Sequence, residues 1–346
     1  MNTIIDKDLL SIQEARILAE NASEARKKLE EFSQDKLDSI VERMASEIEK
    51  HVESLAKMSA DETYYGVWQD KLLKNRFVCS YVRKQLRGMK CVGIIKEDTS
   101  KQTMDIGVPM GVIASVIPAT NPVSTTIYNT LIAIKSGNAI IFSPHPRALK
   151  TTARALDILI ETAEAAGLPE CAISYLHTVT KSGTKELISH ESVNLIMITG
   201  VPKIMKLAAY TGKPVLYGSA GNGPAFIEKT ADITKAVSDI ISSKIFDNGV
   251  GAASEQSIVV DAAVESAVKA EFISRGAYFM TEKEADTLGK MLFLSNGSTD
   301  PEFVGKSAEY LAKRAGIKVP EGTVVLVSHQ DYVSGKNPYS KERLCP

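Results

Sequence analysis

Five short apolar segments between residues 108 and 230 constrain the fold of this chain most strongly. Each shows little alternation between apolar and polar residues, and most end in a loop of small or polar residues before a helical stretch. Strands of this kind are buried on both faces, which is typical of a parallel sheet covered by helices. The sequence therefore predicts an α/β fold with a doubly wound unit over residues 108–230. The segments are 111–117, 138–143, 173–179, 193–200 and 213–219.

The regions on either side of this unit have different patterns of apolar residues. The first hundred residues have helical spacing, with Ser11 and Glu14 as a predicted capping box at the start of the first helix. A second apolar face runs from Leu37 to Leu55 at helical spacing and is predicted to be core. A helix from Asp232 opens a second α/β region that continues to the last residue.

Composition excludes several classes of function. The chain has 41 basic and 42 acidic residues and a formal net charge of −1, so no strong overall field attracts it to nucleic acid or to a membrane. No apolar run approaches the roughly 20 residues that a membrane-spanning helix needs. The first residues lack the pattern of a signal peptide. Four sparse cysteines without CxxC spacing argue against a disulfide framework or a zinc site, and predict a cytoplasmic protein.

Ligands of a doubly wound sheet bind beyond the carboxyl ends of its strands. Four loops qualify by position, and each offers backbone N–H groups, small residues or hydroxyls, although none has the spacing GxGxxG or GxxxxGKS. Ordinary β–α turns remain an equal alternative. The loops are 117–122, 143–147, 199–204 and 217–223.

Three features in or near these loops could carry chemistry. Asn121 could donate its amide to an oxyanion, or it could only form a turn or cap a helix. His145 lies between two prolines and could be a base or a loop residue. Small residues within 246–256 could admit a ligand to the backbone or could only allow tight packing.

Taken in order, seven stretches of this sequence resemble the CoA-acylating branch of the aldehyde dehydrogenase superfamily. That branch includes acetaldehyde, propionaldehyde and succinate-semialdehyde dehydrogenases and the N-terminal half of bifunctional aldehyde/alcohol dehydrogenases. The resemblance implies an NAD(P)- and CoA-binding domain with a helical N-terminal region at 1–230. It also implies a catalytic α/β domain at 231–346 that lacks its C-terminal part. The stretches are 111–125, 138–148, 198–200, 212–224, 244–257, 316–323 and 341–346.

The resemblance also implies roles for individual residues. Asn121 matches the asparagine of the oxyanion hole, and Ala252 stands at the position of the nucleophilic cysteine. Gly218 stands where hydrolytic relatives carry the glutamate that activates water, which favours acyl transfer to CoA. The expected cofactor is NAD or NADP, and CoA is the expected co-substrate. The residues that match cofactor-binding positions are Ile117, Pro118, Ala119, Thr120, Ser143, Pro144, His145, Thr199, Gly200, Gly218 and Glu342.

The expected function is reversible conversion of an aldehyde, CoA and NAD(P) into acyl-CoA and NAD(P)H, silenced here because alanine cannot replace the thiol. Val201 and Lys203 replace small residues that the branch favours in one cofactor turn. Three alternatives stay open. The first is a deliberate cysteine replacement in a shortened enzyme, and the second is a natural non-catalytic relative that binds nucleotide or CoA or assembles with an active partner. A truncated product with little function is the third. A homo-oligomer, as dimer or tetramer, is expected.

Overall fold

The computed structural model describes residues 6–294 and 298–346, and the chain divides into two compact units. Unit 1 comprises Met1–Thr63 and Lys71–Ser219, and unit 2 comprises Tyr64–Asp70 and Ala220–Pro346. Helix α4 (Trp68–Phe77) therefore begins in unit 2 and continues into unit 1. The assignment of a cofactor domain up to residue 230 stays a prediction.

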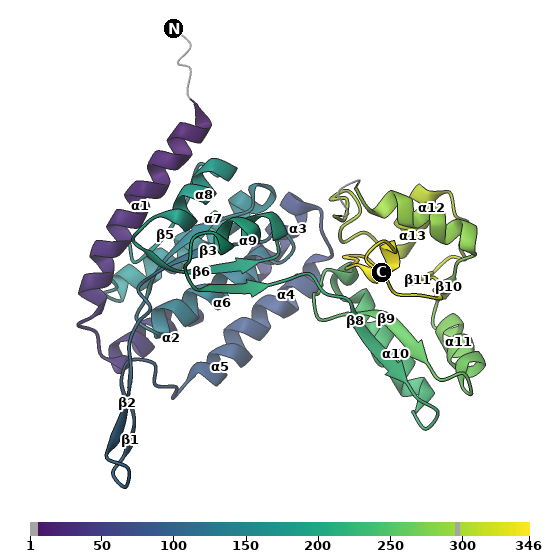
Figure 1. Ribbon diagram of the computed structural model, residues 1–346, viewed down its shortest axis with the longest axis horizontal. Helices are drawn as coiled ribbons and strands as arrows, with labels where there is room; N and C mark the ends of the chain where they lie inside the picture. The colour runs from purple at the N-terminus through teal and green to yellow at the C-terminus, as the bar shows by residue number, and fades with distance from the viewer. Residues whose placement is uncertain (1–5, 295–297) are drawn as a thin grey trace. The chain divides into compact units, whose positions relative to one another are not determined.

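Unit 1 contains a five-stranded parallel sheet, as the sequence predicted (Figure 1). Strands β3, β4 and β5 are buried along their whole length, which explains why their sequences do not alternate. The strand order is β5-β4-β3-β6-β7. The strands are β3 (Val112–Val116), β4 (Ala139–Ser143), β5 (Ile173–Tyr175), β6 (Val193–Thr199) and β7 (Val215–Gly218).

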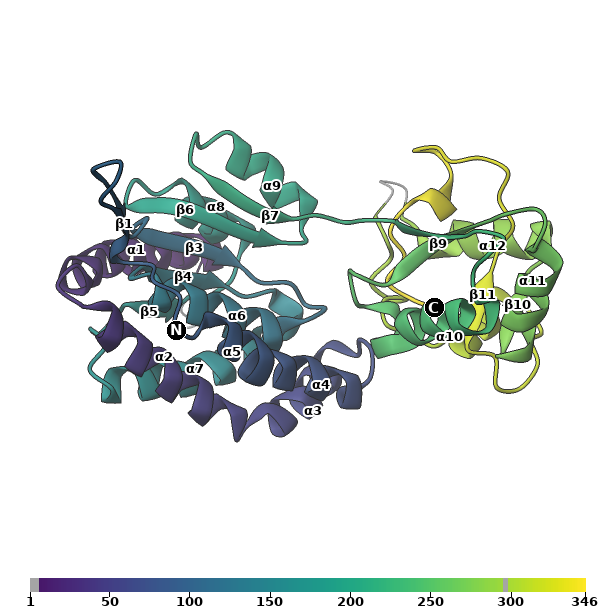
Figure 2. The same cartoon turned by 90° about the horizontal axis from the view of Figure 1, so that it is seen from below.

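Helices cover both faces of this sheet, so the doubly wound α/β prediction is confirmed (Figure 2). One face carries α1 (Lys7–Leu29), α8 (Lys181–Ser189) and α9 (Pro202–Ala209). The other carries α2 (Gln34–Glu49), α6 (Pro122–Lys135) and α7 (Leu149–Ala165), with α3 (Val52–Thr63) packed on α7. The predicted apolar face from Leu37 to Leu55 is buried, on α2 and α3.

The predicted capping box at Ser11 is wrong. Helix α1 begins at Lys7, where the Asp6 side chain accepts hydrogen bonds from two backbone N–H groups of the first turn. Ser11 lies inside the helix, fully buried, and its hydroxyl donates to the carbonyl of Thr178 at 2.5 Å. Glu14 accepts from the backbone N–H of Thr178 at 2.9 Å. Ser11 and Glu14 therefore bind the loop at Thr178 and do not cap the helix.

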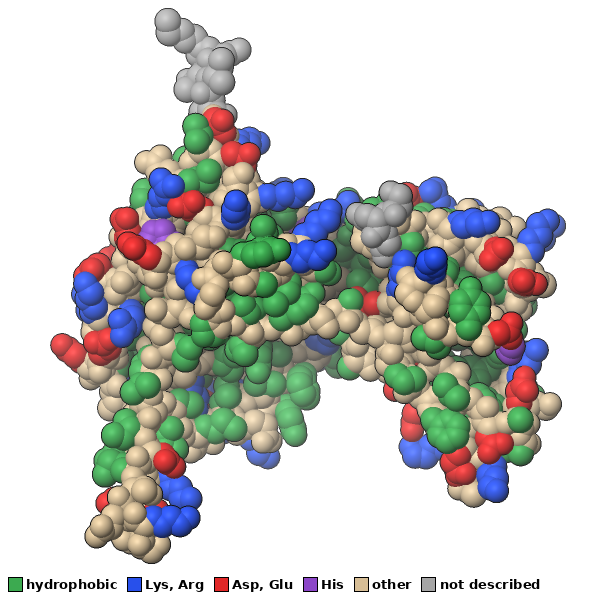
Figure 3. Space-filling model, in the orientation of Figure 1, with side chains coloured by type: hydrophobic (Ala, Val, Ile, Leu, Met, Phe, Trp, Pro, Cys, Tyr) green, Lys and Arg blue, Asp and Glu red, His purple; other side chains and the backbone are tan. Residues whose placement is uncertain are grey.

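The prediction of helix throughout the first hundred residues also fails beyond residue 92. After the π-turn Val78–Val82 and α5 (Arg83–Leu86), the chain forms an antiparallel hairpin of β1 (Gly93–Asp98) and β2 (Thr103–Gly107). Figure 3 shows apolar side chains along this hairpin, and Ile94 and Ile106 are more than half exposed. The hairpin was missed because its apolar residues do not pack on a core.

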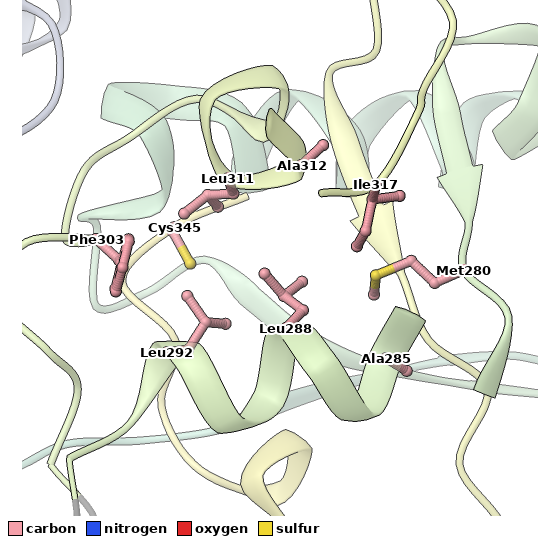
Figure 4. Close-up of a cluster of buried hydrophobic side chains, with 9 residues drawn as sticks. All are labelled: Met280, Ala285, Leu288, Leu292, Phe303, Leu311, Ala312, Ile317 and Cys345. Atoms are coloured by element: carbon pink, nitrogen blue, oxygen red, sulfur yellow. The ribbon is translucent and has the colours of Figure 1, made fainter. Parts of the chain in front are cut away.

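Within its described residues, unit 2 contains two parallel sheets of two strands each and four α-helices. The helices 233–245, 265–274, 282–292 and 308–315 and the strands 255–260 and 325–327 confirm the second predicted α/β region, whereas the strands 223–227 and 277–279 were not predicted. Figure 4 shows one apolar cluster, which includes Cys345, Leu288 and Phe303. The elements are β8 (Gly223–Ile227) with β9 (Glu255–Val260), β10 (Ala277–Phe279) with β11 (Val325–Val327), α10 (Ile233–Ile245), α11 (Glu265–Ser274), α12 (Glu282–Leu292) and α13 (Ala308–Ala315).

A cavity of about 570 Å³ in unit 2 is lined by residues of both β9 and β11. Among the described residues, β9 pairs only with β8, and β11 only with β10. Lys244, Gln256 and Arg343 bring polar groups to the wall, and most of the remaining lining is apolar.

Candidate active site

Four loops of unit 1 lie along one edge of its sheet, because they follow the carboxyl ends of the neighbouring parallel strands β4, β3, β6 and β7. The backbone N–H of Ile117 donates to the carbonyl of Ser143 at 3.1 Å, and that of Gly200 donates to the carbonyl of Gly218 at 2.9 Å. The structure thus brings together the cofactor residues that the sequence placed in unit 1. Their contacts with a cofactor stay predictions.

Two of the candidate side chains have partners inside the unit. The hydroxyls of Ser143 and Thr184 form a hydrogen bond of 2.8 Å. Nδ1 of His145 accepts from the backbone N–H of Arg147 at 3.0 Å and caps the 3₁₀ turn Pro146–Ala148. Burial, with a contribution from the Arg147 charge, lowers the pKa of His145. Because Nδ1 already accepts this hydrogen bond from the turn, the contact supports the loop role for this histidine over the role of a base.

The turn before α9 leaves open backbone at the same edge. Gly200 and Val201 both have left-handed φ angles, of 69° and 53°. A Cβ at Gly200 would meet nothing nearer than Pro118 at 4.0 Å, and one at Gly218 would meet nothing nearer than 3.9 Å. Open glycine backbone beside the N-terminus of a helix suits an anionic group such as a phosphate. The residues present therefore fit a dinucleotide.

Asn121 occupies the N-cap position of α6, yet its side chain makes no capping hydrogen bond. Its Oδ1 accepts a hydrogen bond from Nζ of Lys74. Nζ of Lys71, on the same helix, donates to the carbonyl of Thr120 at 3.0 Å. The two lysines were missed from the sequence, because only the folded chain brings α4 next to this loop.

In unit 2 the loop that carries Ala252 follows a rigid turn, the 3₁₀ segment Phe246–Gly249. Asp247 and Asn248 are both left-handed, a conformation that aspartate and asparagine tolerate better than most residues. Asp247 is fully buried, and its Oδ1 accepts from the backbone N–H of Val67 at 2.8 Å. The backbone N–H of Asp247 donates to Oδ2 of Asp70 at 2.6 Å.

Further contacts fix the end of this turn. A Cβ on Gly249 would lie 2.8 Å from the carbonyl carbon of Cys345, so only glycine fits there. Nδ2 of Asn248 donates to the carbonyl of Gly305 at 3.0 Å. Ala252 itself is exposed. The turn therefore presents residue 252 on a rigid support, and the bracing residues at 64–70 and 305 carried no recognisable signal in the sequence.

Glu342 lies in unit 2, in the segment before Pro346. Its Oε1 accepts from the backbone N–H of Gly221 at 3.3 Å, and burial raises its pKa. The next residue, Arg343, is held against β9 by Gln256. The backbone N–H of Arg343 donates to Oε1 of Gln256 at 3.1 Å. Nζ of Lys244 donates to the same Oε1 at 3.1 Å.

Three of the four cysteines, Cys79, Cys171 and Cys345, are poorly suited to act in place of Ala252. Burial raises the pKa of Cys79, to about 12, and also the pKa of Cys171 and Cys345. The thiol of Cys345 lies in an apolar cluster (Figure 4). A raised pKa disfavours the thiolate, which is the nucleophilic form. Cys91 follows α5 in unit 1, far along the chain from residue 252.

Over the described ranges 6–294 and 298–346, no helix is long and apolar enough to cross a membrane. The same ranges contain no group of three or more histidine, cysteine, aspartate or glutamate side chains arranged to hold a metal ion.

A family model described as the aldehyde dehydrogenase family matches residues 3–289. The chain belongs to the aldehyde dehydrogenase family. It is 38% identical over 336 residues to the bifunctional aldehyde-alcohol dehydrogenase AdhE of Escherichia coli K12, a match that covers 97% of this chain and 38% of AdhE. It is 34% identical to the acetylating succinate-semialdehyde dehydrogenase of Clostridium kluyveri, over 95% of this chain and 72% of that one.

Solved structures confirm the fold and the acylating branch of the family. An acetylating aldehyde dehydrogenase from Geobacillus thermoglucosidasius has a TM-score of 0.94 and 41% identity, over 99% of this chain and 76% of that one. A Rhodopseudomonas palustris propionaldehyde dehydrogenase has a TM-score of 0.80 and 26% identity, over 94% and 73% of the two chains. The latter structure contains bound CoA and an acylated cysteine. An engineered glycolyl-CoA reductase with a TM-score of 0.80 and 25% identity, over 94% and 73% of the chains, contains NADP⁺.

Proposed function

We propose that this chain is a CoA-acylating aldehyde dehydrogenase that binds NAD or NADP and CoA but does not turn over aldehyde, because position 252 carries no thiol. The rigid turn 246–249 supports the proposal, because it precedes the exposed Ala252, the residue that the resemblance matches to the nucleophile. The chain spans 38% of the length of AdhE, so the activity of the whole enzyme is part of the proposal.

The loops of unit 1 would hold the dinucleotide. The open space beside Gly200 and Gly218 would leave room for its phosphates, and the loop 117–120 would contact its adenosine. The resemblance to the family assigns Glu342 to a cofactor ribose. A bound nicotinamide supplies the hydride acceptor of the reaction. By resemblance, Asn121 is the residue whose amide donates to the oxyanion that forms when the family's thiolate nucleophile adds to the aldehyde carbonyl.

The residue at position 218, a glycine, indicates which molecule accepts the acyl group. A hydrolytic enzyme needs a base that activates water against the thioester. Gly218 has no side chain that could serve, so a thioester at position 252 would persist until a thiol displaced it. CoA is the thiol bound by the R. palustris relative, and we infer the same acceptor here. The substrates would be a small aldehyde or, in reverse, an acyl-CoA.

The test is to restore the thiol. We expect the Ala252→Cys variant to form NADH from short aldehydes only when both NAD and CoA are present, and the unaltered chain to form none. Ala253→Cys is the matched control, since it places a thiol on the next residue of the same exposed loop. Calorimetric titration with NAD and CoA measures binding independently of turnover.

Each outcome is informative. NADH from Ala252→Cys alone supports the proposal. NADH from Ala253→Cys as well would mean that the position of the thiol does not matter, which contradicts it. A folded Ala252→Cys variant that stays inert but binds NAD or CoA favours the second candidate, a non-catalytic relative. Absence of binding by every variant refutes both.

Two further proposals concern the setting of the protein. The exposed apolar residues of the β1–β2 hairpin support a homo-oligomer, a dimer or a tetramer, in which this hairpin is a subunit contact (Figure 3). The four free cysteines support a location in the reducing cytoplasm. Light scattering after replacement of Ile94 and Ile106 by lysine tests the first proposal, since the variant should then be monomeric.

A further inference from the structure

The side chain of Asn121 is not used in the way its place in the fold would suggest. An asparagine at the N-cap of a helix ordinarily accepts a hydrogen bond from a backbone N–H of the first turn through Oδ1. In α6 that capping bond is absent. Oδ1 instead accepts from Nζ of Lys74. The oxygen of this amide is therefore bonded to a residue of another helix, Lys74 of α4.

The identity of the partner settles the orientation of the amide. Oxygen and nitrogen of an asparagine side chain are assigned from their hydrogen bonds, and an ammonium group can only donate. Lys74 must therefore contact the oxygen, and the NH₂ group lies on the other branch of the amide. A partner that could accept, such as a hydroxyl, would allow either orientation.

The loop that carries Asn121 is held from the same helix face. Lys71 and Lys74 are three residues apart on α4 and thus neighbours on its surface. Lys71 is 3% exposed, and its Nζ donates to the carbonyl of Thr120 at 3.0 Å. One lysine fixes the backbone next to Asn121, and the other fixes its side chain. All of these contacts lie within unit 1.

We propose that Lys74 is a positioning residue, which holds Oδ1 of Asn121 and thereby fixes the branch of the amide that carries the N–H donors for an oxyanion. A cation on the acceptor end also polarises the amide and strengthens its N–H groups as donors. The inference rests on the proposed function of Asn121, and Lys71 supports it by fixing the loop.

The first test needs no catalytic activity. The side-chain amide signals of Asn121 are recorded by ¹H–¹⁵N NMR in the unaltered chain and are assigned by their loss in Asn121→Asp. We expect Lys74→Met, which keeps the length of the side chain but removes the donor, to move these signals. Lys74→Arg keeps the cation and should leave them close to their original place. Lys84→Met, at an exposed lysine of α5, is the control.

The second test uses the cysteine-restored enzyme. In an Ala252→Cys background, Lys74→Met should lower kcat about tenfold or more, because a donor aimed at the oxyanion is worth at least that much. The KM for CoA should stay within about twofold, and Lys74→Arg should recover most of kcat. Should Lys74→Met not fold, Lys74→Gln serves in both tests.

The two tests separate the two proposals. If Ala252→Cys is inert, the proposed function fails, and the amide signals still decide whether Lys74 orients Asn121. Signals that stay in place in Lys74→Met overturn the inference. An unchanged kcat in an active background, or a loss of thermal stability with no loss of kcat per folded molecule, also overturns it.

Discussion

Lys244 allows a quantitative prediction about the stability of unit 2. Its side chain is 7% exposed, and Nζ donates to Oε1 of Gln256 and to the carbonyl of Arg343, both at 3.1 Å. Burial, together with the nearby Arg343 charge, lowers the pKa of Lys244 from 10.5 to about 8. Below pH 8 the folded chain therefore carries a buried ammonium whose burial lowers the free energy of unfolding.

The sign of the pH dependence follows from the two pKa values. Between about pH 8 and pH 10.5 the unfolded chain binds more protons at Lys244 than the folded chain, so this residue makes stability rise with pH. Across pH 7 to 10 the gain is about 2.5 kcal/mol, since one pKa unit corresponds to about 1.4 kcal/mol. Lys244→Met has no such group. We therefore compare the free energies of unfolding of the variant and the unaltered chain. The value for Lys244→Met minus the value for the unaltered chain should fall by about 2.5 kcal/mol from pH 7 to pH 10.

The assay is urea unfolding at pH 7, 8.5 and 10, followed by the fluorescence of Trp68, the single tryptophan of the chain, which lies in unit 2. Burial raises the pKa of Cys345, which opposes the effect of Lys244, but this thiol is present in both proteins and largely cancels in the difference. Lys235→Met, on the exposed part of α10, is the matched control. A difference that is independent of pH, or one that grows with pH, would refute the reasoning.

Three smaller predictions concern backbone geometry. Val201 is a β-branched residue with a φ of 53°, so Val201→Gly should raise the free energy of unfolding by about 1 kcal/mol; a lower thermal midpoint would contradict this. Gly249→Ala should cost about 2 kcal/mol or more, because its Cβ would meet the backbone of Cys345 at 2.8 Å. Gly251→Ala, where a Cβ meets nothing within 4 Å, should change stability by less than about 0.5 kcal/mol, and equal effects at the two glycines would argue against the clash. Asp247→Ala should lower stability by about 1–3 kcal/mol in urea unfolding, because it leaves the half-buried backbone N–H of Val67 without its acceptor; a neutral outcome would show that water replaces the carboxylate.

Patterns that depend on burial were readable from the sequence. Strands β3, β4 and β5 of unit 1 could be predicted because a strand that is buried on both faces shows little alternation between apolar and polar residues. The hairpin β1–β2 could not, because its apolar residues are exposed in this chain and share no buried face. Ser11 and Glu14 had the spacing of a cap, but hydrogen bonds to Thr178 and its neighbour outweighed that local role.

Some features of the candidate site could also be predicted from the sequence, and others could not. The edge that carries loops 117–122 and 199–204 follows from the order of strands and helices along the chain, so it could be predicted. The partners of its side chains could not. Lys74 lies 47 positions from Asn121, and Val67 lies 180 positions from Asp247. No spacing rule connects residues so far apart, and the contacts exist only after the elements have packed.

The two short sheets of unit 2 have a consequence for work with this protein in concentrated solution. Among the described residues, β9 and β11 each pair along one edge, and residues of both line an apolar cavity. The backbone groups on an unpaired edge can bond to any extended chain that reaches them, and two-stranded sheets alone are marginally stable. Aggregation beyond the proposed oligomer should therefore begin at unit 2 and increase with protein concentration, so purification and crystallisation depend on dilution or on a charged residue placed at the outer face of β9.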